Sequence, residues 1–207
     1  MLRDMPNSPG PRARSSAAAT KQALLDSARD EFAEHGIAGA RVDRIAKRAG
    51  VNKERIYGYF GNKEKLFDAV MKAAMDELVE VTAMPGDNPV DYVGKLFDYY
   101  VRNPVLLRLL LWESLYHRTN TLPEQQWRVD RCRQKVVSLA DRLGEEPSDE
   151  IGRTVLTLKG LALMPMVMPQ IAALFGASMD TPESIAQMRE HVMAFARTAM
   201  ENRTTAE

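Results

Sequence analysis

The sequence has few of the features that mark secreted, membrane or disulfide-rich proteins. Its single cysteine, Cys132, excludes an internal disulfide and favours a reducing compartment. No apolar run reaches the roughly 18 residues that a membrane-spanning helix needs. The longest candidate, residues 161–175, is interrupted by Pro165, Pro169 and Gln170. The N-terminus lacks the apolar stretch of a secretory signal, so we expect a cytoplasmic protein.

Motifs for catalysis and cofactor binding are also missing. There is no Gly-rich phosphate loop, no His-Glu-x-x-His motif and no Cys/His spacing typical of zinc sites. His35, His117 and His191 are scattered over different expected helices. We therefore expect no enzyme activity, no metal and no cofactor. Cys132 lies between two arginines and could be a redox sensor, or it could be a bystander thiol.

The chain has no net charge, but its charges are unevenly distributed. Residues 1–65 contain 13 Lys+Arg and 8 Asp+Glu, a net charge of +5, so the remainder carries −5. A basic end is typical of a DNA-contacting region, although a solvated helix face gives a similar imbalance. With 207 residues, 45% of them hydrophobic, the chain is long enough for one large or two small globular domains.

The first 18 residues are rich in Pro, Ser, Ala and Arg and have no apolar periodicity. We interpret residues 1–18 as a disordered basic arm. Its Arg12 and Arg14 could reach a DNA minor groove, or the arm could be an inert tail.

Beyond this arm the apolar residues recur with helical spacing, and no segment alternates as a strand would. We therefore expect an all-α fold of about nine helices. The expected helices cover residues 20–36, 42–49, 53–60, 63–81, 89–102, 104–116, 123–143, 149–175 and 182–200. Residues 104–116 are apolar on nearly every side, which predicts a central, buried helix. Pro165 and Pro169 predict a kink in the helix over 149–175.

Residues 41–60 are the most informative stretch. Their first helix has apolar residues at i, i+3, i+4 and i+7, namely Val42, Ile45, Ala46 and Ala49. Gly50 follows where a chain leaving a helix often adopts positive φ, and Asn52 is a good N-cap for the next helix. Ile56 and Phe60 then face inward, one turn apart. Two short helices joined by a tight turn form a helix-turn-helix, whose second helix can enter the DNA major groove.

Together with the flanking helices, this motif resembles the TetR family of transcriptional regulators over about residues 20–67. The resemblance is carried by Leu24, Ala28, Phe32, Gly36, Ile45-Ala46, Ala49-Gly50-Val51, Ile56-Tyr57, Tyr59-Phe60 and Asn62-Lys63-Glu64. The sequence departs from the family pattern in two places. Ala40-Arg41 replaces the usual capping Thr or Ser, a loss of about 1 kcal/mol. Gly58 stands where the family carries a larger side chain.

The resemblance implies a DNA-binding domain at residues 19–65 and a helical effector-binding and dimerisation domain at residues 66–207. It implies a repressor that binds a palindromic operator as a homodimer and is released by a small apolar or aromatic effector. An architectural DNA binder without a ligand is the alternative.

The DNA-binding candidates follow from the faces of the two short helices. Lys53 and Glu54 can read guanine and cytosine, and Tyr57 can contact a thymine methyl group. Gly58 either lets the backbone approach the groove or reflects neutral drift. The remaining candidates, most of them for phosphate contact or helix capping, are Arg41, Arg44, Asn52, Arg55, Tyr59 and Lys63.

The last long helices should form the dimer seam, unless their apolar residues are internal core. These residues are Leu156, Leu163, Val167, Ile171, Leu174, Ile185, Met188, Val192, Phe195 and Ala199. Aromatic, methionine and nearby polar residues are the candidates for an effector pocket, although each could instead be core, and Glu113 and His117 could instead pair with a nearby Arg. They are Phe97, Tyr100, Leu110, Trp112, Glu113, Tyr116, His117, Trp127, Met164 and Met168.

Overall fold

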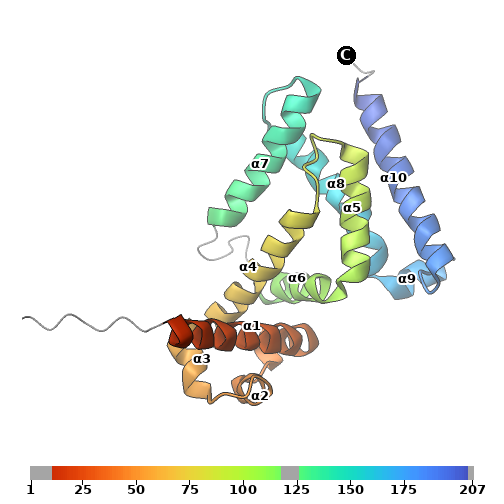
Figure 1. Cartoon of the computed structure of the whole chain (residues 1–207). Helices are drawn as coiled ribbons and strands as arrows, with labels where there is room; N and C mark the ends of the chain where they lie inside the picture. Colours follow the sequence, from red (N-terminus) through yellow and green to blue (C-terminus); the bar gives the residue numbers. More distant parts are fainter. Residues whose placement is uncertain (1–10, 118–125, 205–207) are drawn as a thin grey trace, which may run out of the picture. The chain divides into compact units, whose positions relative to one another are not determined.

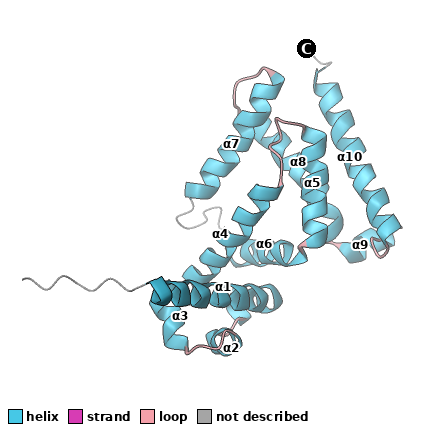
Figure 2. Ribbon diagram, viewed as in Figure 1, coloured by secondary structure: helices cyan, strands magenta, loops and turns pink. Residues whose placement is uncertain are grey.

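The computed structural model describes residues 11–117 and 126–204, and every regular element in those ranges is an α-helix (Figures 1 and 2). The expected all-α fold is confirmed. The helices are α1 (Pro11–Gly39), α2 (Val42–Arg48), α3 (Lys53–Phe60), α4 (Lys63–Val81), α5 (Pro89–Arg102), α6 (Pro104–Tyr116), α7 (Gln126–Leu143), α8 (Asp149–Val167), α9 (Pro169–Leu174) and α10 (Pro182–Thr204). No helix in the described ranges combines the length and the apolar character needed to span a membrane.

The helices belong to two compact units. Unit 1 comprises Met1–Ala74 and Arg108–Arg118, and unit 2 comprises Met75–Leu107 and Thr119–Glu207. Helices α4 and α6 therefore contribute residues to both units.

Helix α1 begins at Pro11, earlier than the start expected at Thr20. Residues 11–18 are therefore helical, whereas residues 1–10 and the side chains of Arg12 and Arg14 lie outside the described residues. Proline fits the first helical position because its fixed φ suits a helix and its missing N–H would have no intrahelical partner. The alanine run that follows has the highest helix propensity. Apolar periodicity alone missed the helix before Thr20 because no core stripe marks those residues.

The core of unit 1 joins α1 to the two short helices and to α4. Phe32 and Phe67 meet edge to face with ring centroids 5.1 Å apart, and Ile45 and Ile56 of the short helices are fully buried. Gly36 interrupts the helical geometry of α1 with φ of 66°, which confirms the break expected there. A Cβ at this position would lie 2.8 Å from the Trp112 ring, so only glycine fits.

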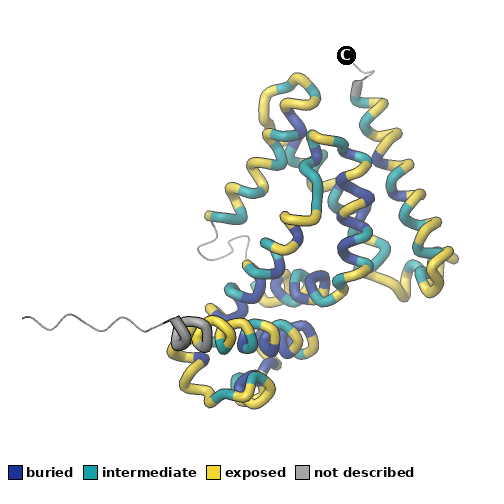
Figure 3. Tube along the Cα trace, in the orientation of Figure 1, coloured by how far each residue is buried: buried dark blue, intermediate teal, exposed yellow. Residues whose placement is uncertain are grey.

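Helix α5 is the most buried helix of unit 2, as its largely dark blue trace in Figure 3 shows. Its buried face packs against α8 and α10. Asp98 on α5 accepts two hydrogen bonds from the Arg189 guanidinium of α10, at 2.8 and 3.1 Å. The expectation that residues 104–116 form the central buried helix is wrong, because the second half of α6 exposes Leu111 and Leu115.

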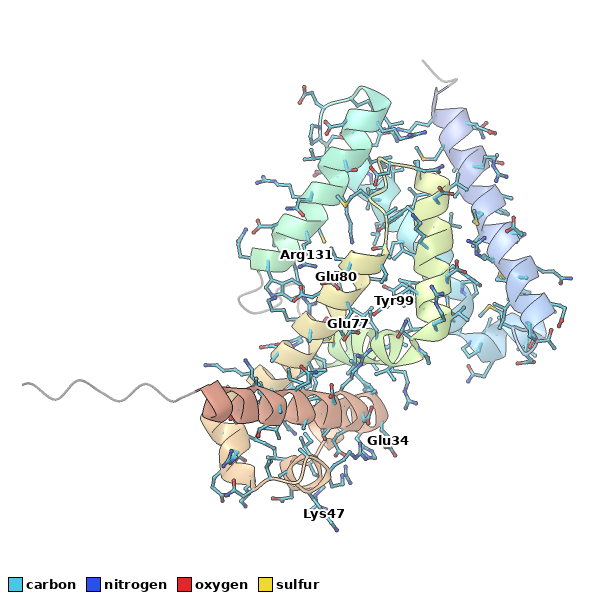
Figure 4. All side chains as sticks on the ribbon, in the orientation of Figure 1. Glu34, Lys47, Glu77, Glu80, Tyr99 and Arg131 are labelled. Carbon is cyan, nitrogen blue, oxygen red and sulfur yellow. The ribbon has the colours of Figure 1, made fainter. Side chains whose placement is uncertain are left out.

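Helix α7 is tied to the rest of unit 2 near both ends. Near its start, Arg131 projects toward α4 and pairs with Asp76 at 2.6 Å (Figure 4). Near its end, the Gly86 amide donates to the Ser138 hydroxyl at 3.0 Å, and Arg142 donates to the backbone carbonyl of Gly86 at 3.3 Å. The expected start of this helix at residue 123 lies outside the described residues.

The single helix expected over residues 149–175 is two helices, so the described residues contain ten helices where about nine were expected. Met168 adopts φ −130° and ψ 64°, which ends α8, and Pro169 starts α9. Proline cannot donate the next helical hydrogen bond and restricts the residue before it, so a break replaces the expected kink. Pro165 is accommodated inside α8.

Candidate nucleic-acid interface

Helix α3 has the geometry of a recognition helix. The Asn52 side chain accepts a hydrogen bond from the Arg55 amide at 3.3 Å, which confirms the predicted N-cap. Ile56 is fully buried and Phe60 is 9% exposed, so both anchor the inner face as expected. Capping and anchoring therefore fix the direction of this short helix.

The opposite face of α3 is open to solvent. Lys53, Glu54 and Tyr57 are all exposed, with 48% of Tyr57 accessible. Lys53 lies 3.8 Å from Asp43, a surface ion pair that contributes little and can rearrange on binding. A Cβ built on Gly58 meets no atom within 4 Å, so nothing inside the protein requires glycine there. The base-reading roles of these four residues stay predictions.

The uncapped start of α2 is stabilised by a residue that the sequence reasoning missed. Arg41 precedes α2 and provides no side-chain cap, as expected. Instead Oε1 of Glu31, a carboxylate only 1% exposed, accepts hydrogen bonds from the Arg41 amide at 2.8 Å and from Arg44 Nε at 2.7 Å. The sequence did indicate that Glu31 is buried. Glu31 follows Leu24 by seven residues, which places it on the apolar face of α1.

The environment of Glu31 keeps its carboxylate charged. Burial by itself raises the pKa of Glu31, but hydrogen bonds from Arg44 and the Arg41 amide, with the charges of Arg44 and His35, outweigh it. The net result is a pKa below the ordinary value of 4.5. The second oxygen, Oε2, lies 3.9 Å from His35 Nε2. Glu31 therefore acts as a buried anion that holds the junction between α1 and α2.

Several of the predicted phosphate contacts already have partners inside unit 1. Arg44 binds Glu31 and also donates to the Gly39 carbonyl at 3.2 Å. The Lys63 ammonium donates to the carbonyls of Ala38 and Ala40, each at 3.3 Å. Both cations therefore fix the end of α1, a role that the sequence did not predict.

Other predicted contacts remain available to DNA. The side chains of Arg41 and Arg55 are exposed and form no ion pair within the described residues. Lys47 extends from α2 into solvent (Figure 4) and adds a cation that the prediction omitted. Tyr59 is 37% exposed, and its hydroxyl lies 3.5 Å from the Ala17 carbonyl of α1.

The predicted dimer residues occupy an apolar surface over α8, α9 and α10 in unit 2. Leu156, Ile171, Leu174 and Phe195 expose between 47% and 82% of their areas, while Val192 is only 4% exposed. Val192 therefore belongs mainly to the core. The remaining predicted residues are half-buried or exposed: Leu163, Val167, Ile185, Met188 and Ala199.

The predicted effector residues do not share one environment. Phe97 and Tyr100 are buried on α5, and Trp127 is half-buried on α7 beneath Arg128 and Arg131. The residues of the pocket prediction that belong to unit 1 are Leu110, Trp112, Glu113, Tyr116 and His117.

Trp112, Met164 and Met168 do not share one pocket, since Trp112 borders a small hollow in unit 1 and the two methionines line a groove in unit 2. The Trp112 indole donates to the Ala33 carbonyl at 3.2 Å and packs on Gly36, so it fastens α6 to α1. Met164 and Met168 expose about half of their surface on the α8–α10 face. They line a groove of about 610 Å³ there, with Phe175 and Phe195 among the other lining residues.

Comparison with known families and structures agrees with this geometry. The profile of the bacterial regulatory proteins of the tetR family matches residues 24–70. A second profile, the tetracyclin repressor-like C-terminal domain, matches residues 88–198, which is more than half of the chain. Together the two profiles cover both units.

Two curated relatives of this chain are named as transcriptional repressors. The HTH-type transcriptional repressor SCO4008 of Streptomyces coelicolor is 42% identical over 123 residues, which are 59% of this chain and 64% of that protein. The HTH-type transcriptional repressor NicS of Pseudomonas putida is 31% identical over 53% of this chain and 55% of its own length. The chain therefore spans less than two thirds of the curated relatives that it matches.

The fold itself matches solved structures over most of its length. The candidate transcriptional regulator SCO4942 from Streptomyces coelicolor is 32% identical, with a TM-score of 0.70 over 87% of this chain and 97% of that one. The capped, outward-facing α3, the two matching profiles and this structural likeness lead to one conclusion. The chain belongs to the TetR family of bacterial regulatory proteins.

Proposed function

We propose that the chain is a transcriptional repressor that binds a palindromic operator as a homodimer and responds to a small molecule. The observation that carries DNA binding is α3, because its outer face is uncovered within unit 1 while its inner face and N-terminus are fixed. A capped and anchored helix with exposed polar side chains in its first turn suits readout of the major groove. The relatives named as repressors support repression as the outcome.

Phosphate contact is supported by the cations around α3. Arg41, Arg55 and Lys47 are exposed, and none of them is held by an intramolecular ion pair in the described part of the chain. Such cations displace counterions from DNA, so binding should weaken steeply with salt. Arg44 and Lys63 would contribute mainly by holding α1 and α2 in place.

The apolar surface on α8–α10 supports the homodimer. Leu174 and Phe175 expose 82% and 83% of their areas, and Phe195 exposes 58%. Large apolar side chains clustered on one face indicate an interaction site. Two such faces would pack as a four-helix arrangement, and a two-fold dimer would place two α3 helices on the half-sites of a palindrome.

A response to a small molecule is supported by the match of unit 2 to the C-terminal domain profile. AibR is a protein of this fold that has been solved with isovaleryl coenzyme A and operator DNA. It is 17% identical to this chain with a TM-score of 0.60, a likeness of fold alone.

Selection of bound sequences from a random DNA pool tests the proposal. The purified full chain should enrich a palindrome with half-sites about one helical turn, or about 34 Å, apart. Arg41→Ala and Arg55→Ala should each lower the salt slope of binding by about one. Absence of any enriched sequence would refute DNA recognition. Enrichment of an asymmetric site bound by a monomer would refute the dimer.

A further inference from the structure

Asp43 on α2 is an exposed carboxylate beside the first turn of α3. Its Oδ1 lies 3.8 Å from the ammonium of Lys53, the first residue of α3. Both side chains are more than half exposed, 66% for Asp43 and 55% for Lys53. An ion pair this exposed contributes at most about 1 kcal/mol to stability. The pair therefore does little to hold the fold, and both groups can turn toward a ligand at small cost.

The position of Asp43 can be compared with that of a second surface carboxylate in unit 1. Asp30 on α1 is 63% exposed and lies 3.6 Å from Arg48, in the last turn of α2. Asp43 lies in the first turn of α2, where a negative charge interacts favourably with the helix dipole. Of these two acids, Asp43 is the one beside the end of α3 that meets base edges in helix-turn-helix docking.

A carboxylate on a DNA-contacting surface opposes binding unless a base uses it. The exposed cations Arg41, Lys47 and Arg55 attract phosphates, whereas the charge of Asp43 repels them. This repulsion is offset where the carboxylate accepts a hydrogen bond from a base. In the major groove the donors available to it are cytosine N4 and adenine N6. A carboxylate at this position therefore favours some base pairs and disfavours others.

The two neighbouring charges match the major-groove edge of one G·C base pair. Guanine presents N7 and O6 as acceptors, and cytosine presents N4 as a donor next to O6. An ammonium group only donates hydrogen bonds and a carboxylate only accepts them, so Lys53 suits guanine and Asp43 suits cytosine. In an A·T pair, adenine N6 would oppose the ammonium and thymine O4 would oppose the carboxylate. The pair therefore distinguishes G·C from A·T through both of its members.

We propose that Asp43 is a specificity-determining residue, which accepts a hydrogen bond from cytosine N4 while Lys53 donates to O6 and N7 of the paired guanine. Helix α2 then reads sequence as well as supporting α3. The exposed Glu54 is left to contact a different base pair. This inference rests on the proposed function, since it assigns a base-reading role within the same DNA-binding surface.

Selection of bound sequences from a random DNA pool provides the first test, with each variant as the full-length protein. Asp43→Ala should lose the preference for one G·C pair in each half-site by about fivefold or more and keep the other preferences. Lys53→Met should relax the same base pair. Asp30→Ala is the matched control and should select the same sequence as the parent. An unchanged preference in Asp43→Ala, or relaxation of different base pairs by the two variants, would overturn the proposal.

A modified base provides the second test, at the level of single atoms. N4-methylcytosine keeps its base pairing but places a methyl group where the major-groove donor of N4 was. At the cytosine of that G·C pair it should weaken the parent by about fivefold or more and leave Asp43→Ala unaffected. Glu54→Gln should be weakened as much as the parent, because its contact lies elsewhere. The reverse result, with Glu54→Gln unaffected and Asp43→Ala weakened, would assign the cytosine to Glu54 and refute the role of Asp43.

The same experiments separate this inference from the proposed function. If the parent selects no sequence, DNA recognition itself fails. If the parent selects a palindrome whose G·C preferences all survive Asp43→Ala, the repressor stands and the role of Asp43 fails. Both alanine variants should melt within a few degrees of the parent, because each removes an exposed side chain, so a changed preference is not a consequence of unfolding.

Discussion

The two units differ in how their buried polar side chains are bonded. In unit 1 the buried Glu31 carboxylate receives two hydrogen bonds and a guanidinium charge, and it fixes the start of α2. In unit 2 the buried hydroxyls of Tyr92 and Tyr100 have no hydrogen-bond partner in the described part of the chain. The bonded oxygen of Glu31 therefore fixes one local geometry in unit 1, whereas these two hydroxyls of unit 2 anchor no neighbouring element.

The largest expected effect comes from the outer surface of unit 2. Introducing charge with Leu174→Glu and Phe195→Glu should prevent two copies from packing on α8–α10. A monomer would lose the gain from binding two half-sites together, so operator affinity should fall by about 10²- to 10⁴-fold. Light scattering coupled to chromatography and a mobility-shift titration would measure both changes.

Val129 on α7 provides the control for this surface. It is 58% exposed but lies outside α8–α10, so Val129→Glu should leave both mass and affinity unchanged. A dimer that survives the double charge substitution would show that unit 2 does not associate through this face.

In unit 1 the strongest single change should be Glu31→Ala. It leaves the Arg41 amide and the Arg44 guanidinium without their acceptor, which should destabilise the protein by about 2 kcal/mol. Operator affinity should also fall, because α2 loses its fixed start. Chemical denaturation measures the first effect. Glu34→Ala on the same helix is the matched control, because that side chain is 61% exposed and the change should be nearly neutral. Equal stability of the two variants would contradict the role of Glu31.

Gly58→Ala should act in the opposite direction on stability. Its Cβ would meet nothing within 4 Å, and alanine favours a helix over glycine by about 1 kcal/mol, so the free protein should become more stable by up to that amount. Operator affinity should fall if the backbone of α3 approaches the groove closely. Unchanged affinity for the selected operator would mean that glycine at this position has no role in DNA binding.

The pH dependence of stability should show a smaller effect of the same carboxylate. The pKa of Glu31 is lowered in the folded protein, so the folded state binds fewer protons than the unfolded state near pH 4.5. The contribution of Glu31 to the free energy of unfolding is present above that pH and is lost as the pH falls through the pKa of the folded state. Thermal melts between pH 6 and pH 3 should show a steeper loss for the parent than for Glu31→Gln. If the melting temperatures of the two proteins fell in parallel with pH, protonation of Glu31 would have no effect on stability.

The parts of the fold that follow from local chemistry were predictable. The Asn52 cap, the break at Gly36 and the inward Ile56 and Phe60 depend on residues close in sequence, and all are present. The break at Met168 was only half predicted, because a proline inside a helix can either kink or end it. The choice depends on packing, which periodicity does not contain.

In the candidate sites, too, features set by local helical geometry were predictable, and features set by tertiary packing were not. The outward face of α3 followed from helical geometry, whereas the engagement of Arg44 and Lys63 required knowledge of where the end of α1 lies. Residue type alone grouped Met164 and Trp112 in one pocket, although they lie in different units, because an aromatic or sulfur side chain suits core, seam and pocket equally.

The apolar surface of α8–α10 has a consequence for how the protein works at low copy number. Because Leu174, Phe175 and Phe195 would be covered only in the dimer, association is linked to folding stability by mass action, and the melting temperature should rise with protein concentration. Where monomers predominate, the amount of dimer grows with the square of the monomer concentration. A modest change in expression would then produce a larger change in operator occupancy, a sharpening of the response that needs no additional ligand.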